Sequence, residues 1–169
     1  EGVIIQKPVY FPFEECVLDN GRALVNNELL EQDGYYTMDF DDLERKASCP
    51  ENKMLLLCSP HNPVGRVWTK EELARVGEIC KKNNVLVIAD EIHSDLVYAG
   101  YVHTPFALAS DAPHLVCTSL GKTFNVAGLR LANIFSSSAE LKKQYDQEID
   151  AYSYSASNTF GLEMVQAAY

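Results

Sequence analysis

Short apolar runs rich in β-branched residues alternate along this chain with longer amphipathic stretches. The pattern predicts strands at residues 2–5, 22–25, 53–58, 85–89, 114–118 and 131–135, and helices at residues 39–47, 69–83, 139–152 and 160–169. Strands that are apolar on both faces are typical of sheets covered by helices, and their alternation with helices favours parallel pairing. We therefore predict an α/β fold with three layers, α/β/α, around a mostly parallel sheet.

The stretch 69–83 carries the clearest helix signals. Thr69 is a good N-cap, and Glu72 three residues later completes a capping box. Four apolar residues then recur on one face: Leu73, Val76, Ile79 and Cys80. We expect this face to pack on the sheet. Asp39 is a possible cap for the shorter helix at 39–47.

Length and charge narrow the class of protein. The chain has 169 residues, 47% of them hydrophobic, which is enough for one domain with a sizeable core. Lys plus Arg number 14 and Asp plus Glu 24, so the net charge is −10, and no basic cluster interrupts this balance. We expect no nucleic-acid partner and no membrane. No apolar run reaches the roughly 18 residues of a membrane-spanning helix.

The five cysteines are Cys16, Cys49, Cys58, Cys80 and Cys117. Their number is odd, no C-x-x-C pair occurs, and most of them lie in apolar runs. We interpret them as reduced core residues of a cytoplasmic protein rather than as disulfide partners or zinc ligands.

Both ends of the chain lie next to regular structure. The sequence starts at Glu1-Gly2, directly before an apolar run, and residues 163–169 continue an amphipathic pattern with no Gly or Pro stop signal. We expect the chain to be entered in mid-domain and to be a fragment of a longer protein.

Polar residues follow three of the predicted strands. Asn62 follows strand 53–58, Asp90 and His93 follow strand 85–89, and Ser119 and Lys122 follow strand 114–118. In open parallel sheets, ligands bind beyond the carboxyl ends of the strands. The sequence therefore predicts a binding site where these side chains converge.

This set of side chains suits pyridoxal phosphate. A lysine amine forms a Schiff base with a carbonyl, and an anion opposite the pyridine nitrogen keeps the ring an electron sink. Lys122 and Asp90 supply these two groups, while Ser119 and Arg130 flank the lysine as phosphate donors.

Each of these residues also has an ordinary structural interpretation. Lys122 could be a solvated surface group, Asp90 could cap the turn that follows it, and His93 could be a structural histidine. The segment N-P-V-G at residues 62–65 is locally a plain turn. Only their occurrence together, on successive strand ends, favours a site.

Three segments match a known family. Residues 119–130, S-L-G-K-T-F-N-V-A-G-L-R, resemble the cofactor-lysine signature of class I/II aminotransferases. N-P-V-G at 62–65 resembles that family's N-P-x-G turn, and D-E-I-H-S-D at 90–95 resembles its D-E-x-x strand end. The lysine signature is specific, N-P-x-G alone is weak, and the similarity extends over essentially the whole chain.

The resemblance implies a pyridoxal-phosphate enzyme of fold type I, a homodimer with active sites at the subunit interface. It also implies that residues 1–169 are the central part of the large domain, with an N-terminal segment and a C-terminal small domain absent. Lys122 would be the Schiff-base lysine and the proton shuttle. Asp90 would pair with the pyridine N–H, Asn62 would hydrogen-bond the ring hydroxyl oxygen, and Tyr10 would stack on the ring. Ser119 and Arg130 would hold the phosphate.

Two departures from the family pattern bear on function. His93 stands where many aminotransferases have a tyrosine, and with H-T-P-F at 103–106 it most resembles the cystathionine β-lyase-like branch. This implies a β C–S lyase that acts on cystathionine or other cysteine-type substrates and gives pyruvate, ammonia and a thiol; an aminotransferase that moves an amino group between an amino acid and a 2-oxo acid is the alternative. Gly121 replaces the usual serine, and we expect little effect from that change.

Other classes of protein match less well. A nucleotide-binding P-loop needs a Gly five residues before the Gly121-Lys122 pair, where this chain has Val116. A metallohydrolase would use Asp90, His93 and Asp95, but no H-E-x-x-H motif or second histidine cluster supports it, so we expect no metal. A catalytically silent 169-residue piece of an enzyme remains a serious alternative.

Overall fold

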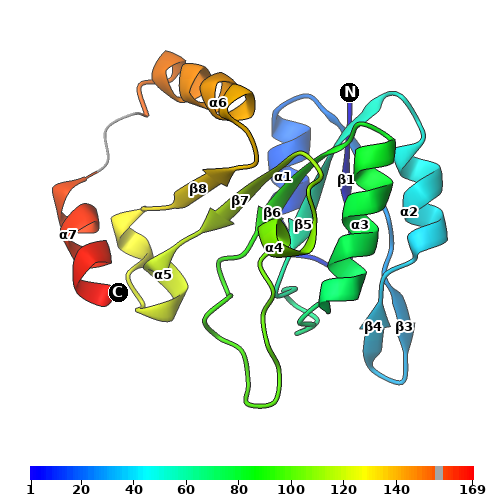
Figure 1. Cartoon of the computed structure of the whole chain (residues 1–169), viewed down its shortest axis with the longest axis horizontal. Helices are drawn as coiled ribbons and strands as arrows, with labels where there is room; N and C mark the ends of the chain where they lie inside the picture. Colours follow the sequence, from blue (N-terminus) through cyan, green and yellow to red (C-terminus); the bar gives the residue numbers. More distant parts are fainter. Residues whose placement is uncertain (155–157) are drawn as a thin grey trace.

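The computed structural model describes residues 1–154 and 158–169. Within these residues the main sheet has the strand order β2-β1-β5-β6-β7-β8 (Figure 1). All neighbouring strands are parallel except β7 and β8, which are antiparallel. The strands are β1 (Gly2–Ile5), β2 (Ala23–Asn26), β5 (Asn52–Cys58), β6 (Leu86–Asp90), β7 (His114–Thr118) and β8 (Asn133–Ser136). The predicted mostly parallel α/β fold is confirmed.

Helices cover both faces of this sheet. On one face lie α2 (Phe40–Ala47), α3 (Lys70–Lys82) and the short α4 (Phe106–Ala109), packed on alternate strand residues such as Ile4, Leu55 and Val87. On the other face α1 (Pro12–Asp19) buries Val17 against Val3 and Ile5. Near the edge strand β8 lies α6 (Ala139–Ala151). The helix α7 (Thr159–Ala168) lies beside the segment after β7, where the ring of Tyr169 contacts that of Phe124. The two apolar clusters produce the predicted layers.

The predicted helix caps form as the sequence indicates. The Thr69 hydroxyl accepts a hydrogen bond from Glu72 N at 3.2 Å, and Glu72 Oε2 accepts one from Thr69 N at 2.7 Å. Asp39 Oδ1 accepts from Asp42 N at 2.9 Å at the start of α2. These bonds satisfy amide groups that have no partner within the helix.

Several elements were not predicted. They are α1, the hairpin of β3 (Leu30–Gln32) and β4 (Tyr35–Thr37), α4, α5 (Leu120–Thr123) and the 3-10 turn η1 (Ala127–Leu129). The strand predicted at 131–135 begins only at Asn133, because the backbone at Arg130 adopts a left-handed conformation (φ 49°) that turns the chain. The strand predicted at 85–89 is shifted by one residue, so that it ends at Asp90.

The interpretation of all five cysteines as core residues was wrong for two of them. Cys58 and Cys80 are buried and Cys117 is half-buried, but Cys16 and Cys49 are exposed. All five are free thiols.

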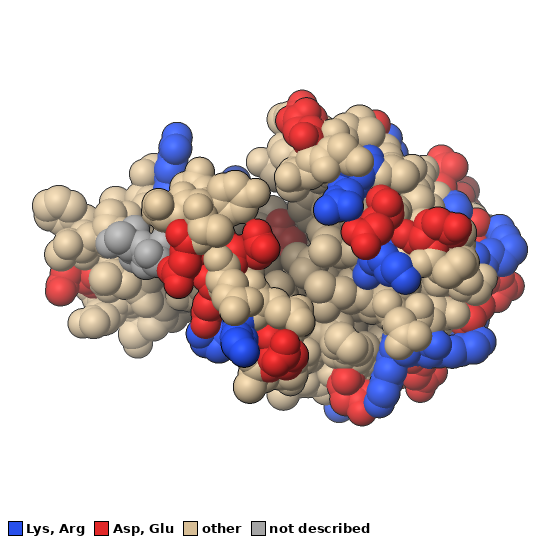
Figure 2. Space-filling model, turned by 90° about the horizontal axis from the view of Figure 1, so that it is seen from above, with Lys and Arg blue, Asp and Glu red and all other residues tan. Residues whose placement is uncertain are grey.

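Acidic and basic side chains are interspersed on the face that Figure 2 shows. Lys81 pairs with Asp111 at 2.6 Å, and Lys82 pairs with Glu44 at 2.8 Å. Among the described residues, no helix combines the length and the apolar character that a membrane span requires. Of the chain over which the family resemblance extends, residues 155–157 lie outside the described part.

Candidate active site

One small cavity lies at the carboxyl ends of four adjacent parallel strands. It has a volume of about 70 Å³. Its lining comes from the last residues of β5 and β6 and from the segments after β1, β5, β6 and β7: Tyr10, Cys58, Asn62, Asp90, Ile92, His93 and Lys122. The structure thus brings together five of the seven predicted site residues, from positions 112 residues apart in the sequence.

Asn62 is held in a tight turn after β5. His61 N donates to Arg66 O and Gly65 N donates to His61 O, each at 2.8 Å. Gly65 has a φ of 73°, a left-handed conformation that glycine adopts at little cost. The backbone N–H of Asn62 donates to the buried Cys58 Sγ at 3.3 Å. Asn62 also lines the cavity.

Asp90 is the last residue of β6 and is half-buried. Burial raises the pKa of its carboxyl group, while the Ile92 N–H bond and the nearby His93 and Lys122 charges act in the opposite direction. Its Oδ1 accepts from Ile92 N at 3.2 Å, so the turn-capping interpretation is also correct. A buried carboxyl in this position would be stabilised as the anion by any cationic N–H group placed in the cavity.

His93 and Cys58 contribute uncharged groups. Burial lowers the pKa of His93, and although Asp90 acts to raise it, the Lys122 charge lowers it further. Burial raises the pKa of the Cys58 thiol to about 12. At neutral pH the imidazole is therefore neutral and the thiol protonated, so Cys58 is a lining group rather than a nucleophile.

Lys122 is placed by the short helix α5 after β7. Ser119 caps α5: its hydroxyl accepts from Gly121 N at 3.0 Å and donates to Leu131 O at 2.7 Å. A Cβ atom on Gly121 would lie 3.2 Å from the Cα of Ala127 and 3.1 Å from Ser119 Oγ, so glycine permits a close approach here. The exposed Lys122 supplies the amine of the cavity.

Tyr10 closes the cavity from the β1 side. Its ring contacts those of Phe11 and Phe13, with centroids 5.6 Å and 6.2 Å apart. Ile92 also lines the cavity and was missed by the sequence analysis. Cys58, the last residue of β5, lines the cavity too and was assigned only to the core, whereas Ile92 lies in the turn after β6, where no strand period could have indicated it.

Ser119 and Arg130 do not line this cavity. Both oxygen and proton of the Ser119 hydroxyl are engaged by Gly121 and Leu131. Arg130 lines a different cavity, of about 610 Å³, beside Tyr145 of α6. Their phosphate-binding roles stay predictions.

The lining groups of the small cavity fit pyridoxal phosphate. An amine, a carboxyl group, an amide and an aromatic ring are the groups that would attach the aldehyde, face the ring nitrogen, bind the ring hydroxyl and stack on the ring. Among the described residues, no group of three or more His, Cys, Asp and Glu is placed to hold a metal ion.

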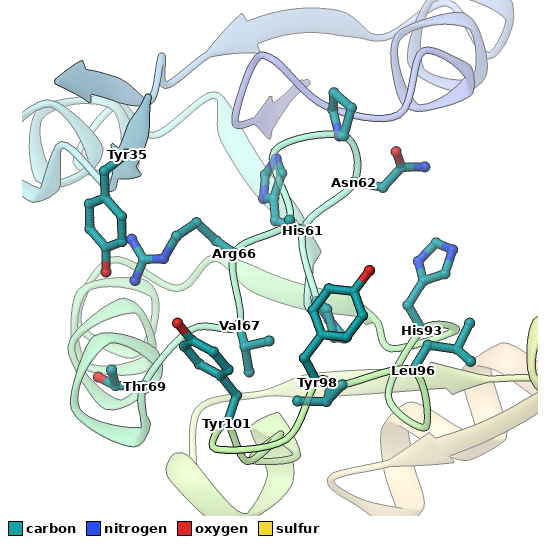
Figure 3. Close-up of a pocket in the computed structure, with 14 residues that line it drawn as sticks. Tyr35, His61, Asn62, Arg66, Val67, Thr69, His93, Leu96, Tyr98 and Tyr101 are labelled. Carbon is teal, nitrogen blue, oxygen red and sulfur yellow. The ribbon is translucent and has the colours of Figure 1, made fainter. Parts of the chain in front are cut away.

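A larger recess of about 540 Å³ adjoins the small cavity and shares Asn62 and His93 with it. Figure 3 shows Tyr98 and Tyr101, from the loop after β6, across the recess from Tyr35 of β4, with the Arg66 side chain beside Tyr35. The site therefore has a narrow polar floor and a wide aromatic approach.

The sequence model of the aminotransferase class I and II family matches residues 1–169. The chain belongs to this family. It is 42% identical over 172 residues to cystathionine beta-lyase PatB of Bacillus subtilis, which covers 100% of the chain and 44% of the relative. It is 37% identical over 129 residues to Protein MalY of Escherichia coli, which covers 76% of the chain and 33% of that protein.

Solved structures agree. The crystal structure of cystalysin from Treponema denticola, which contains pyridoxal 5′-phosphate, matches with a TM-score of 0.93 and 41% identity, covering 96% of this chain and 42% of that one. The chain therefore spans less than half of the length of PatB, MalY and cystalysin.

Proposed function

We propose that these residues form the central part of the large, pyridoxal-phosphate-binding domain of a β C–S lyase that acts on cysteine-type thioethers. The observation that carries the proposal is the cavity in which Lys122, Asp90, Asn62 and Tyr10 converge. Because the chain spans 44% of PatB, an N-terminal segment and a C-terminal small domain would complete the enzyme.

Pyridoxal phosphate, when bound, supplies the electron sink for the pair left on the substrate Cα. Lys122 would attach it covalently, Asp90 would hold a proton on the ring nitrogen, and Tyr10 would support the ring. The freed Lys122 amine would then remove the α-proton, because it is the basic amine in the cavity.

The overall lyase reaction is balanced with one water. The electron pair released at Cα would form a Cα=Cβ double bond while the Cβ–S bond breaks. The thiolate would leave with the pair of that bond, and the Lys122 ammonium would give its proton to the sulfur. Hydrolysis of the remaining three-carbon amine gives pyruvate and ammonia. No external oxidant or reductant is needed.

Similarity to PatB, whose name is cystathionine beta-lyase, supports the lyase. Aminotransferase activity is the second candidate, because Lys122, Asp90 and Asn62 serve the first steps of both reactions and the family itself is named for transamination. The two reactions diverge only in whether a β-thiolate leaves or the electron pair is protonated elsewhere.

In the deciding experiment, L-cystathionine is added without any keto acid to the full-length protein loaded with pyridoxal phosphate. Sustained release of pyruvate is the expected result. A single turnover that stalls and resumes when a keto acid is added would establish the aminotransferase instead. Failure to bind the cofactor would contradict both reactions.

We further propose a cytoplasmic homodimer for the full-length protein. The five free thiols support a reducing compartment. The dimer rests on the resemblance to fold type I enzymes, and light scattering of the full-length protein tests it directly.

A further inference from the structure

The recess beside the cofactor cavity is built mainly from aromatic and aliphatic side chains. We call it the tyrosine recess, after Tyr35, Tyr98 and Tyr101. Leu96 and Val97 complete the wall that the loop after β6 provides. Its volume of about 540 Å³ lies within the range of small-molecule sites, roughly 300–1,000 Å³.

The three tyrosines are unusually exposed for such large side chains. The exposed fractions are 87% for Tyr98, 68% for Tyr101 and 59% for Tyr35. Clustered exposed apolar surface generally marks a binding site. The recess shares Asn62 and His93 with the cofactor cavity, so a molecule reacting there would extend into it.

The recess offers no free charge to a ligand. Among the described residues that line it, Arg66 is the only Lys, Arg, Asp or Glu. Its guanidinium donates to both carboxylate oxygens of Glu72, at 2.8 and 2.9 Å, and to the Tyr36 carbonyl. It is also sandwiched between the rings of Tyr35 and Trp68, 4.5 Å from each centroid.

The remaining polar groups of the recess are neutral or committed. His61 is 1% exposed and its Nε2 donates to the Pro8 carbonyl at 2.9 Å. Burial lowers the pKa of both His61 and His93. A charged ligand group in the recess would therefore find no free opposite charge among these described residues, whereas the tyrosine, leucine and valine side chains offer apolar contacts.

We propose that the tyrosine recess binds the substituent on the substrate sulfur and selects uncharged alkyl or aryl groups over substituents that carry charge. This inference rests on the proposed lyase function and names its substrate class. S-alkyl- and S-benzyl-L-cysteines are the favoured substrates, whereas L-cystathionine, whose distal end carries an ammonium and a carboxylate, is a poorer one.

The test measures kcat/KM for pyruvate release by the full-length, cofactor-loaded protein. The substrates are S-methyl-, S-ethyl-, S-propyl- and S-benzyl-L-cysteine and L-cystathionine. Each added methylene is expected to raise kcat/KM about fourfold, as burial of a CH₂ group predicts. S-propyl-L-cysteine is expected to exceed L-cystathionine by at least about tenfold.

Two variants tie the preference to the recess. Tyr101→Ala should flatten the dependence on chain length while leaving S-methyl-L-cysteine nearly unaffected, and Tyr98→Ala should act in the same direction. Because both side chains are largely exposed, neither change opens the core. Tyr152→Ala is the matched control, since Tyr152 is 70% exposed and lies at the end of α6.

Three results would overturn the inference. One is a higher kcat/KM for L-cystathionine than for S-propyl-L-cysteine. Another is an absence of chain-length dependence in the parent protein, as expected if another protein segment fills the recess. The third is an equal loss on all substrates in Tyr101→Ala. Pyruvate release from none of the substrates would instead contradict the lyase proposal on which the inference depends.

Discussion

Replacement of Glu91 by alanine is expected to loosen the loop that joins β6 to α4. Glu91 is only 2% exposed, and its carboxylate bonds the far end of that loop. Oε1 accepts from Phe106 N at 2.7 Å, and Oε2 accepts from His103 Nε2 at 3.0 Å. The loop between these contacts carries His93, which lines both the cofactor cavity and the tyrosine recess. The two hydrogen bonds of Glu91, which we call the Glu91 clasp, therefore hold one wall of each.

The size of the effect follows from the two lost bonds. Phe106 is fully buried, so Glu91→Ala leaves its N–H without a partner, at a cost of about 1–3 kcal/mol. The lost His103 contact adds about 1 kcal/mol, giving roughly 2–4 kcal/mol for the loop. Local opening should become about 30- to 900-fold more frequent.

Hydrogen exchange of the full-length protein measures this directly. The Phe106 amide and peptides from residues 92–106 should exchange faster in Glu91→Ala, with a smaller change in Glu91→Gln, which retains one acceptor oxygen. Glu148→Ala, at an exposed position of α6, is the control. Exchange within about threefold of the parent protein would refute the clasp, because so small a change corresponds to well under 1 kcal/mol.

Four further outcomes are expected. Lys122→Ala should abolish the absorption band of covalently attached pyridoxal phosphate. A band that survives would contradict the assignment of Lys122 as the Schiff-base lysine. Asp90→Ala should lower kcat/KM by about 10²- to 10⁴-fold but reduce cofactor retention far less, because the carboxylate matters most as the carbanion forms. Equal turnover by variant and parent would exclude Asp90 as the partner of the ring nitrogen. Burial lowers the pKa of His61, so the unfolded chain gains a proton below about pH 6.5 before the folded chain does. The contribution of His61 to the free energy of unfolding should therefore be fully present above that pH and fall as the pH drops toward the folded pKa. The denaturation midpoints measured at about pH 5.5 and about pH 7.5 should differ less in His61→Gln than in the parent protein. An unchanged difference would show that His61 is not the source of the pH dependence. The 169 residues alone should turn over amino acids far more slowly than the full-length protein, because missing positioning groups can cost several kcal/mol, and parent-like rates would show otherwise.

The central strands and α3 could be predicted because their signals are local. The capping box of Thr69 and Glu72 and the apolar face after it need no knowledge of the rest of the fold. The strands of the hairpin β3–β4 are too short to show a burial period, and the local signal that marks the hairpin is its turn. Asp33 and Gly34 both have positive φ, as the Asp-Gly turns of two-residue hairpins require, and this signal was missed. α1 begins at Pro12, a residue that a helix tolerates in its first turn, so that signal was present but was not used.

The floor of the site could be predicted for a different reason. Asn62, Asp90 and Lys122 each follow a parallel strand, and parallel strands bring their carboxyl ends to one edge. The tyrosine recess follows no such rule. Tyr35 and Tyr101 come from a hairpin and an irregular loop, so only the tertiary structure shows that they face the same space.

Sequence spacing alone could not fix the surroundings of the phosphate site. Ser119 donates its only hydroxyl proton to Leu131 O at 2.7 Å, whereas a phosphate needs that same proton. Breaking the bond to the carbonyl costs about 1 kcal/mol, and a hydrogen bond to an anion is roughly twice as strong as one between neutral groups. Exchange of partners at Ser119 is thus favourable if a phosphate comes within reach. Arg130 differs, because its left-handed backbone directs the chain toward β8 and its side chain lines the cavity beside Tyr145. The serine therefore needs only a change of hydrogen-bond partner to bind a phosphate, whereas the phosphate-binding role of Arg130 stays a prediction.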